Sequence, residues 1–223
     1  MIRVLIVDDH AIVRVGIKRL LQDVPGIRVI ADLCSGEETL SFIRKDQPDV
    51  ILLDVRMPGI GGLETTRRIS KLYPDIKILA VTAFNDNPYP SMVLQAGAAG
   101  FLTKDSGVDE MIDAIKKVFK GERYISPEIA QQLALKSIGE TSAPTPTSPL
   151  EGLSEREIQV MLMLTNGTDI QDIADKLSLS TKTINSYRYR IFEKLGVKND
   201  VELTYYAMRH GYIDKLNYAQ TEE

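Results

Sequence analysis

The stretch VILLDVRMPGIGG, residues 50–62, consists of an apolar run that ends at Asp54 and a glycine-rich loop that follows it. The next segment, GLETTRRISKLY, residues 62–73, is amphipathic at helical spacing. A nearly unbroken apolar run of this length is typical of a strand buried on both faces of a parallel sheet. The stretch therefore predicts one strand–helix unit, with Asp54 at the carboxyl end of the strand.

The same pairing of an apolar run with an amphipathic segment occurs five times in the first 120 residues. Five such units predict a parallel sheet with helices on both faces, and we expect a five-stranded sheet of order 2-1-3-4-5. In the first helical segment, Ile12, Val15, Leu20 and their neighbours recur at roughly the spacing of a buried stripe. The expected strands are 3–9, 28–34, 50–55, 77–83 and 99–104, and the expected helices are 11–23, 36–46, 62–73, 88–97 and 109–121.

The composition changes beyond residue 121. Residues 126–136 predict one further helix with Ser126 as its cap, and residues 137–149 are rich in Ser, Thr and Pro, which is typical of a semi-extended linker. From Leu153 onward the pattern predicts four short helices. Their expected caps are Ser154 in a capping box with Glu157, then Thr168, Ser180 and Asn199, and Gly196 ends the third helix. We therefore predict an α/β domain at 1–121, a linker region at 122–149 and an all-α domain at 150–215.

The composition also excludes several classes of protein. The chain has 223 residues and a net charge of -4, with 43% hydrophobic and 26% charged residues, as in ordinary globular proteins. No apolar run approaches the ~20 residues that cross a bilayer, and the N-terminus lacks a signal-peptide layout. The single cysteine, Cys34, excludes an internal disulfide and zinc sites built from several thiolates. We expect a cytoplasmic protein that does not enter a membrane.

Polar side chains stand at the expected carboxyl ends of four strands, where ligands of open α/β sheets bind. They are Asp8, Asp9, Asp54, Thr82 and Lys104. In the expected order these strands are neighbours, roughly 4.8 Å apart. Three carboxylates at that spacing raise one another's pKa unless a cation neutralises them, and oxygen ligands with open positions suit Mg2+.

Asp54 is the best candidate for a nucleophile in this group, because it is central and precedes the glycine-rich loop. A carboxylate can attack phosphorus to give an aspartyl phosphate, and Lys104 and the Thr82 hydroxyl can hold the phosphoryl oxygens. A single acidic residue at a strand end is more often a helix cap or a solvated turn. The whole set at the right strand ends favours a binding site, whereas His10, without a second histidine nearby, is interpreted as a contact at the start of a helix.

Four motifs, VDDH, LLDVRMPGIGG, AVTA and GFLTKD, occur in this order. Together they make residues 1–121 resemble the receiver domain of bacterial two-component response regulators, which has a flavodoxin-like α/β fold. The resemblance implies that Asp54 is the phosphoacceptor and that Lys104 binds the phosphoryl group. It also implies a switch pair, in which Thr82 is drawn to the phosphoryl group and Phe101 fills the space that it leaves.

The same resemblance implies a Mg2+ site formed by Asp9, Asp54 and the backbone carbonyl of Arg56, with Asp8 assisting through water. An aspartyl-phosphate phosphohydrolase on a similar scaffold is the enzymatic alternative. Such enzymes usually place a second acidic residue two positions after the nucleophile, and Arg56 stands there. We therefore expect no enzyme, beyond slow autophosphorylation and self-dephosphorylation at Asp54.

Residues 180–196, STKTINSYRYRIFEKLG, predict a basic helix in an acidic chain. Between residues 181 and 199, Glu193 alone opposes five basic side chains, Lys182, Arg188, Arg190, Lys194 and Lys198. At helical spacing, Ile184, Ile191 and Leu195 share a face that would pack against other helices. A short turn precedes this helix, which makes the pair a helix-turn-helix candidate, and the second helix of such a unit enters the major groove. The alternative is a solvated helix in a bundle that binds protein.

The order LSEREIQVMLML…NGTDIQDIADKLSLSTKTINSYRYRIFEKLGV resembles the LuxR-type DNA-binding domain over residues 146–213. The resemblance implies a helix-turn-helix at Ile170–Tyr189 and a last helix that helps to pair two domains. It places three residues at base edges, Asn185, Ser186 and Tyr189. It places three others near phosphates, Lys182, Arg188 and Lys194.

A receiver joined to a LuxR-type domain is similar to the NarL/FixJ group of response regulators. The details AQQLAL, VELT and NSYRYRIFEKL resemble the GacA/UvrY type most closely. This resemblance implies a sensor histidine kinase of the hybrid kind, which phosphorylates Asp54. It further implies an active homodimer that binds double-stranded promoter DNA, acts with RNA polymerase and activates genes for small regulatory RNAs.

Overall fold

The computed structural model describes residues 1–82, 89–137, 150, 152–210 and 212. The chain divides into two compact units, Met1–Ala143 and Pro144–Glu223, and each is described by itself. The predicted linker at 137–149 lies outside the described residues, apart from Ser137. The predicted domain boundaries at residues 121, 149 and 215 stay predictions.

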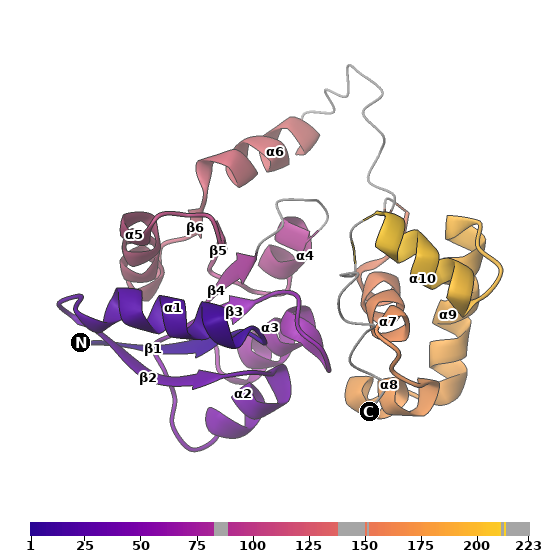
Figure 1. Cartoon of the computed structure of the whole chain (residues 1–223), viewed down its shortest axis with the longest axis horizontal. Coiled ribbons are helices and arrows are strands. Elements are labelled where there is room, and N and C mark those ends of the chain that lie inside the picture. Colours follow the sequence, from indigo (N-terminus) through magenta and orange to yellow (C-terminus); the bar gives the residue numbers. More distant parts are fainter. Residues whose placement is uncertain (83–88, 138–149, 151, 211, 213–223) are drawn as a thin grey trace. The chain divides into compact units, whose positions relative to one another are not determined.

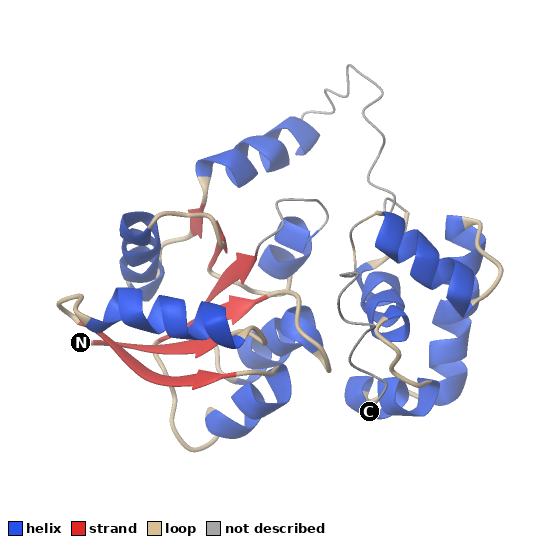
Figure 2. Ribbon diagram, viewed as in Figure 1, coloured by secondary structure: helices blue, strands red, loops and turns tan. Residues whose placement is uncertain are grey.

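The first unit contains a parallel sheet of order β2-β1-β3-β4-β5-β6 (Figure 2). The predicted order of the first five strands is confirmed, but the prediction of only five strands is wrong. Strand β6 is missed because its two residues are too short to show a pattern, and only their pairing with Gly100 and Phe101 makes them a strand. The strands are β1 Ile2–Val7, β2 Ile27–Leu33, β3 Val50–Asp54, β4 Lys77–Thr82, β5 Gly100–Thr103 and β6 Tyr124–Ile125.

In the described part of this unit, six helices accompany the sheet (Figure 1). Alternate side chains of the central strands, among them Ile6, Leu52 and Leu102, enter a core with α1 and α5. The side chains between them point to the other side of the sheet, where α3 contacts β4 and α4 contacts β5. The helices are α1 Ala11–Gln22, α2 Gly36–Phe42, α3 Gly61–Leu72, α4 Tyr89–Gln95, α5 Val108–Phe119 and α6 Pro127–Ser137.

Helix α1 buries a different stripe from the predicted one. Ile12 is 88% exposed and Val15 is 66% exposed, and Leu20 is exposed as well. Ile17 and Leu21 are buried instead, one helical turn apart. The prediction was wrong because α1 is apolar on more than one side, so spacing alone could not decide which side faces the sheet.

The predicted helix at 126–136 forms as α6, but its expected side-chain cap does not. The Ser126 hydroxyl is buried and makes no hydrogen bond with any described residue. Only the carbonyl of Ser126 takes part in the helix, accepting from the Ala130 amide at 2.9 Å. The favourable residue type at this position therefore predicted the helix start but not the hydrogen bond.

The described residues of the second unit form four helices, and three of the four predicted caps are confirmed. Ser154 and Glu157 form the capping box, and the side chains of Ser180 and Asn199 accept from backbone amides. The prediction of Thr168 as a cap was wrong, because Asp169 accepts from the Asp172 amide and the helix begins one residue later. The helices are α7 Glu155–Thr165, α8 Ile170–Leu177, α9 Thr181–Leu195 and α10 Asp200–Arg209. Gly196 ends α9 with a φ of 68°, as predicted. Among the described residues, no helix combines the length and apolar character needed to span a bilayer.

Gly62 brings α3 against the end of β3, and this contact generates a first prediction. A Cβ added there would lie 2.2 Å from the Asp54 carbonyl oxygen and 2.6 Å from the Val55 Cα. Because backbone atoms cannot move aside cheaply, we expect Gly62→Ala to lower the free energy of unfolding by about 1–3 kcal/mol. The urea unfolding transition of the receiver measures this change in free energy.

Gly16→Ala is the matched control for Gly62→Ala. Gly16 lies within α1, and an added Cβ meets nothing within 4 Å. Replacing a glycine inside an exposed helix stabilises it by roughly 0.5–1 kcal/mol. Equal effects of the two substitutions would contradict the close approach of α3 to Asp54.

Candidate functional site

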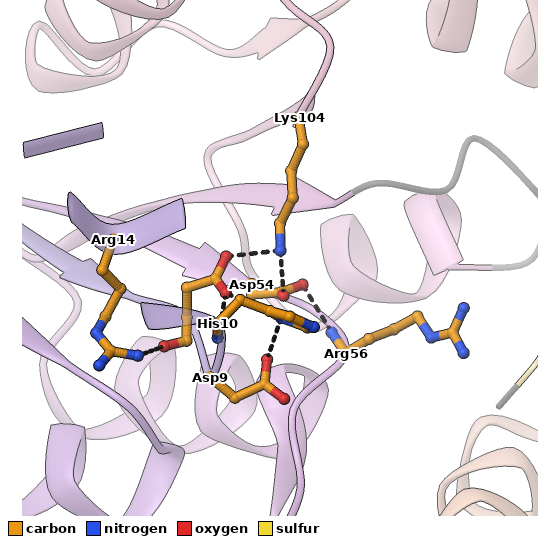
Figure 3. Close-up of polar contacts among 7 residues, drawn as sticks. Asp9, His10, Arg14, Asp54, Arg56 and Lys104 are labelled. Carbon is orange, nitrogen blue, oxygen red and sulfur yellow. Dashed lines mark hydrogen bonds and ion pairs between the residues drawn. The ribbon is translucent and has the colours of Figure 1, made fainter. Parts of the chain in front are cut away.

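Three side chains that are distant in the sequence meet at the carboxyl edge of the sheet (Figure 3). Asp54 is the last residue of β3, whereas Asp8 and Lys104 directly follow β1 and β5. The Lys104 Nζ lies 2.6 Å from Asp8 Oδ2 and 2.6 Å from Asp54 Oδ2. One ammonium group therefore joins the carboxylates of two neighbouring strands.

The site is buried, and burial changes its acid–base properties. Asp54 is 3% exposed, and burial raises the pKa of its carboxyl to about 6, against the opposing effect of Lys104. The nearby Asp8 carboxylate adds to the rise. Burial alone would lower the pKa of Lys104, but Asp54 and Asp8 hold it above its ordinary value. An ionised Asp54 therefore costs stability near neutral pH unless a further cation compensates it.

Backbone and side-chain donors fix the two buried carboxylates in place. The Arg56 amide donates to Asp54 Oδ1 at 3.0 Å, and the His10 amide donates to Asp8 Oδ1 at 2.8 Å. The guanidinium of Arg14, on α1, donates to the carbonyl of Asp8 at 2.6 Å. His10 itself is the N-cap residue of α1, where the sequence placed it. No sequence pattern marked Arg14, because its contact is with a backbone atom of another element.

The residues present fit a divalent cation. Asp8, Asp9 and Asp54 each offer one oxygen, and His10 one nitrogen, with all four atoms within 4.8 Å of one another. Asp9 Oδ1 is buried and lies 2.9 Å from His10 Nδ1, but it accepts no hydrogen bond from any described residue. Among the described residues, the Lys104 ammonium pairs with two of these three carboxylates, while the Arg14 guanidinium pairs with Asp32, so two negative charges of the cluster remain for a divalent ion to neutralise. The part assigned to the Arg56 carbonyl stays a prediction.

The two residues of the predicted switch lie on adjacent strands of the sheet. Thr82 ends β4 and Phe101 lies in β5, and both are buried. Phe101 pairs with Ala80, and Thr82 pairs with Thr103. Since side chains alternate along a strand, Thr82 and Phe101 point to the same face of the sheet, opposite to Leu102. The Lys104 amide donates to the Thr82 carbonyl at 2.7 Å, so the lysine predicted to bind the phosphoryl group is bonded to the predicted switch residue.

In the second unit, four predicted DNA contacts form a stripe along α9. Their spacing of three or four residues places them on one side of the helix. Tyr189 is 64% exposed, Lys182 and Ser186 are exposed, and Asn185 is half-buried. The residues of the stripe are Lys182, Asn185, Ser186 and Tyr189.

The opposite side of α9 packs into the helical unit. Ile184 and Ile191 are buried, as expected from their spacing, but Leu195 is only half-buried. Phe192 is buried in its place. The position of Phe192, one residue after Ile191 and two turns after Ile184, would have predicted this.

The other two predicted phosphate contacts, Arg188 and Lys194, lie elsewhere. Arg188 forms an ion pair with Asp200 of α10, and Lys194 forms one with Glu157 of α7. No sequence pattern indicated these pairings. An acid in the first turn of a helix, such as Asp200, is ordinarily explained by the helix dipole, and Glu157 was already assigned to a capping box.

Each of the two units matches a known protein family. Residues 4–116 match the family described as response regulator receiver domain. Residues 151–207 match the family described as bacterial regulatory proteins, luxR family. The chain belongs to the response regulators.

Close relatives of this response regulator span nearly its whole length. GacA of Pseudomonas protegens is 56% identical over 214 residues, which cover 96% of this chain and 99% of that protein. UvrY of Escherichia coli is 50% identical over 212 residues, which cover 95% of each. A solved structure of two RcsB dimers bound to two parallel DNAs is 26% identical with a TM-score of 0.56, and the match covers 92% of this chain and 96% of that chain. The predicted likeness to the GacA/UvrY type is confirmed, and the response regulator is a two-component protein with a LuxR-type DNA-binding domain.

The surplus negative charge of the acidic site generates a second prediction, which concerns metal binding by the response regulator. Mg2+ is expected to raise the thermal midpoint of the receiver, because a ligand that binds only the folded state stabilises it by about 2.7 kcal/mol at 100 times its Kd. In Asp9→Asn most of this shift is expected to be lost. Asp113→Asn is the control, since Asp113 pairs with Lys117 on the surface of α5. A full Mg2+ shift in Asp9→Asn would show that the ion does not bind between these carboxylates.

Proposed function

We propose that this protein is a phosphorylation-controlled transcription regulator, phosphorylated on Asp54 by a sensor histidine kinase of the hybrid kind. The observation that carries the proposal is the buried Asp54 carboxylate, held between the Arg56 amide and the Lys104 ammonium. This arrangement leaves an oriented nucleophile at the edge of the sheet, where ligands of α/β folds bind.

In the proposed transfer, an oxygen of the ionised Asp54 attacks the phosphorus of the kinase phosphohistidine. The new O–P bond forms as the P–N bond breaks, and the electron pair of that bond stays on the imidazole. Mg2+ bound by Asp9, Asp54 and the Arg56 carbonyl, with Asp8 assisting through water, would supply positive charge that offsets the charge of the phosphoryl group. Lys104 already contacts Asp54 Oδ2, so its ammonium is placed to bind a phosphoryl oxygen after transfer.

The transmission step uses the strands beside the acceptor. The Thr82 hydroxyl turns toward the phosphoryl group, and Phe101 moves into the space that it leaves. Both side chains are buried on one face of the sheet, so that a shift of one leaves room for the other. A local charge thereby changes the packing of the β4–β5 face.

The output step is promoter binding by a homodimer through α9, followed by activation with RNA polymerase. The exposed stripe of Lys182, Asn185, Ser186 and Tyr189 carries groups that hydrogen-bond base edges and phosphates. Likeness to RcsB, whose dimers bind DNA in the solved structure, supports this step. We further propose that this response regulator acts in the cytoplasm and, from its likeness to GacA and UvrY, that its targets are genes for small regulatory RNAs.

An aspartyl-phosphate phosphohydrolase is the alternative function. Arg56 occupies the position where such an enzyme places its second acidic residue, and its amide is bound to Asp54. We therefore propose that the protein releases phosphate slowly, without sustained turnover. Sustained release of phosphate from a small phosphoester would favour the enzyme instead.

The proposal predicts the behaviour of Asp54→Asn. An amide cannot accept the phosphoryl group, so this variant should incorporate no label from radioactive acetyl phosphate. It should also show no gain in DNA affinity on that treatment. Footprinting of genomic DNA with treated and untreated protein measures the gain, and Asp46→Asn, which removes a surface partner of Arg3, is the control. If Asp54→Asn bound its sites as tightly as phosphorylated wild type, phosphorylation control would be refuted.

A separate prediction concerns Thr82. Thr82→Ala should still incorporate phosphate, because the nucleophile is intact, but should lose most of the gain in DNA affinity. Thr103→Ala is a matched control, since Thr103 is the buried neighbour of Thr82 on β5 and bonds to Ser106. Equal loss of the gain in both variants would mean that the effect is one of general packing, and not of the proposed switch.

A further inference from the structure

Two basic side chains of α9 are held in ion pairs within the second unit. Arg188 Nε lies 2.7 Å from Asp200 Oδ1 and Arg188 Nη2 lies 2.5 Å from Asp200 Oδ2, which is a bidentate pair. Lys194 Nζ lies 2.7 Å from Glu157 Oε2. The same oxygen of Glu157 accepts the Ser154 amide at 2.7 Å. Each pair joins α9 to another helix, either α10 or α7.

The positions of Arg188 and Lys194 around α9 agree with their joining this helix to α10 and α7. At 3.6 residues per turn, Arg188 and Lys194 lie roughly 120° from Lys182, on either side of it. Lys182 belongs to the exposed stripe, together with Tyr189. The two paired side chains therefore extend from the flanks of the helix and not from the side of the stripe.

Breaking these ion pairs, so that the basic side chains could contact DNA instead, would cost free energy. Glu157 is buried, and without Lys194 its carboxylate would lose an ion-pair partner. Burial alone would raise the pKa of Glu157, but the hydrogen bonds from Lys194 and Ser154 hold it below its ordinary value. The hydrogen bond to Asp200 raises the pKa of Arg188, so this pair favours the charged form of the guanidinium. Both basic groups are thus already neutralised by partners inside the domain.

Arg188 also connects to the exposed stripe through an aromatic ring. Its guanidinium lies 5.0 Å from the centre of the Phe192 ring. Phe192 in turn contacts Tyr189 edge to face, with ring centres 6.5 Å apart. A chain of contacts thus runs from Asp200 through Arg188 and Phe192 to Tyr189, one of the predicted base contacts.

We propose that Arg188 and Lys194 are positioning residues that fix α9 on α10 and α7, and that neither contacts a DNA phosphate. This inference rests on the proposed function, in which α9 binds DNA, and it replaces the expectation that both residues lie near phosphates. Of the five basic residues between 181 and 199, Lys182 and Arg190 then remain as exposed phosphate contacts of the helix itself. Arg188, held by Asp200, additionally sets the orientation of Tyr189.

The decisive variant is Asp200→Asn in the full chain, with binding to a fluorescein-labelled duplex of mixed sequence measured by anisotropy over a range of salt concentrations. If Arg188 is a positioning residue, loss of its partner weakens binding roughly 2- to 10-fold at every salt concentration. The slope of log K against log salt stays unchanged, because no phosphate contact is lost. If Arg188 binds phosphate, removal of the competing carboxylate should tighten binding.

Glu193→Gln is the control for the general effect of removing a negative charge, since Glu193 is exposed on the same helix. Tighter binding by Asp200→Asn than by Glu193→Gln would overturn the proposal. Circular dichroism of each variant verifies that the helices are folded at the temperature of the binding measurement.

A second variant keeps the test independent of the stability of Asp200→Asn. Arg188→Lys retains the charge but cannot form the bidentate pair. A positioning residue requires both hydrogen bonds of the guanidinium to Asp200, so Arg188→Lys should weaken DNA binding as Arg188→Gln does. The double variant Arg188→Gln/Asp200→Asn should be no weaker than Arg188→Gln alone. Wild-type affinity in Arg188→Lys would mean that Arg188 acts as a phosphate-binding charge and would overturn the proposal.

Lys182→Gln and Lys194→Gln form a matched pair on one helix. The first should reduce the salt slope by about 1, as loss of one phosphate contact does, and the second should leave the slope unchanged. A reduced slope in Lys194→Gln would overturn the assignment of Lys194. Failure of the wild type to bind any duplex would instead refute the proposed DNA binding, so the two failures are distinguishable.

Discussion

The Lys104 ammonium between Asp8 and Asp54 is the interaction on which the receiver depends. It joins the ends of β1, β3 and β5, and it lowers the cost of two carboxylates that are almost fully buried. Without a cation at this point, burial would favour the protonated form of Asp54, and a protonated carboxyl is a poor nucleophile. The same interaction therefore supports both the fold at the sheet edge and the phosphoryl transfer proposed for Asp54.

The parts of the fold that the sequence predicts are those that local patterns determine. The apolar runs located five strands, and the polar residues that end them located the edge where Lys104 meets Asp54. Patterns do not determine which partner an element meets. Strand β6 exists only through pairing with β5, and the buried side of α1 is decided by the sheet, so Ile12 and Val15 are exposed against expectation.

The same division holds in the candidate sites. Helical spacing places Lys182, Asn185, Ser186 and Tyr189 on one exposed side of α9, because that spacing is a property of the helix alone. It cannot reveal that Arg188 meets a residue 12 positions away, or that Lys194 meets one 37 positions away. The likeness to known families transfers positions but not these pairings, since each depends on which side chain stands at the partner position.

The two units balance charge differently. In the second unit, Arg188 and Lys194 each pair with one acidic side chain. In the receiver, three carboxylates share one ammonium, so the site keeps a negative surplus that a divalent ion can neutralise. In the proposed function, a phosphoryl group on Asp54 would add about two negative charges, and Lys104 would divide its contacts between that group and Asp8. Because the Lys104 amide is bonded to the Thr82 carbonyl, a movement of Lys104 acts directly on the end of β4. The lysine that would compensate the new charge in the proposed function is thus also bonded, through its backbone amide, to the end of the strand that carries Thr82.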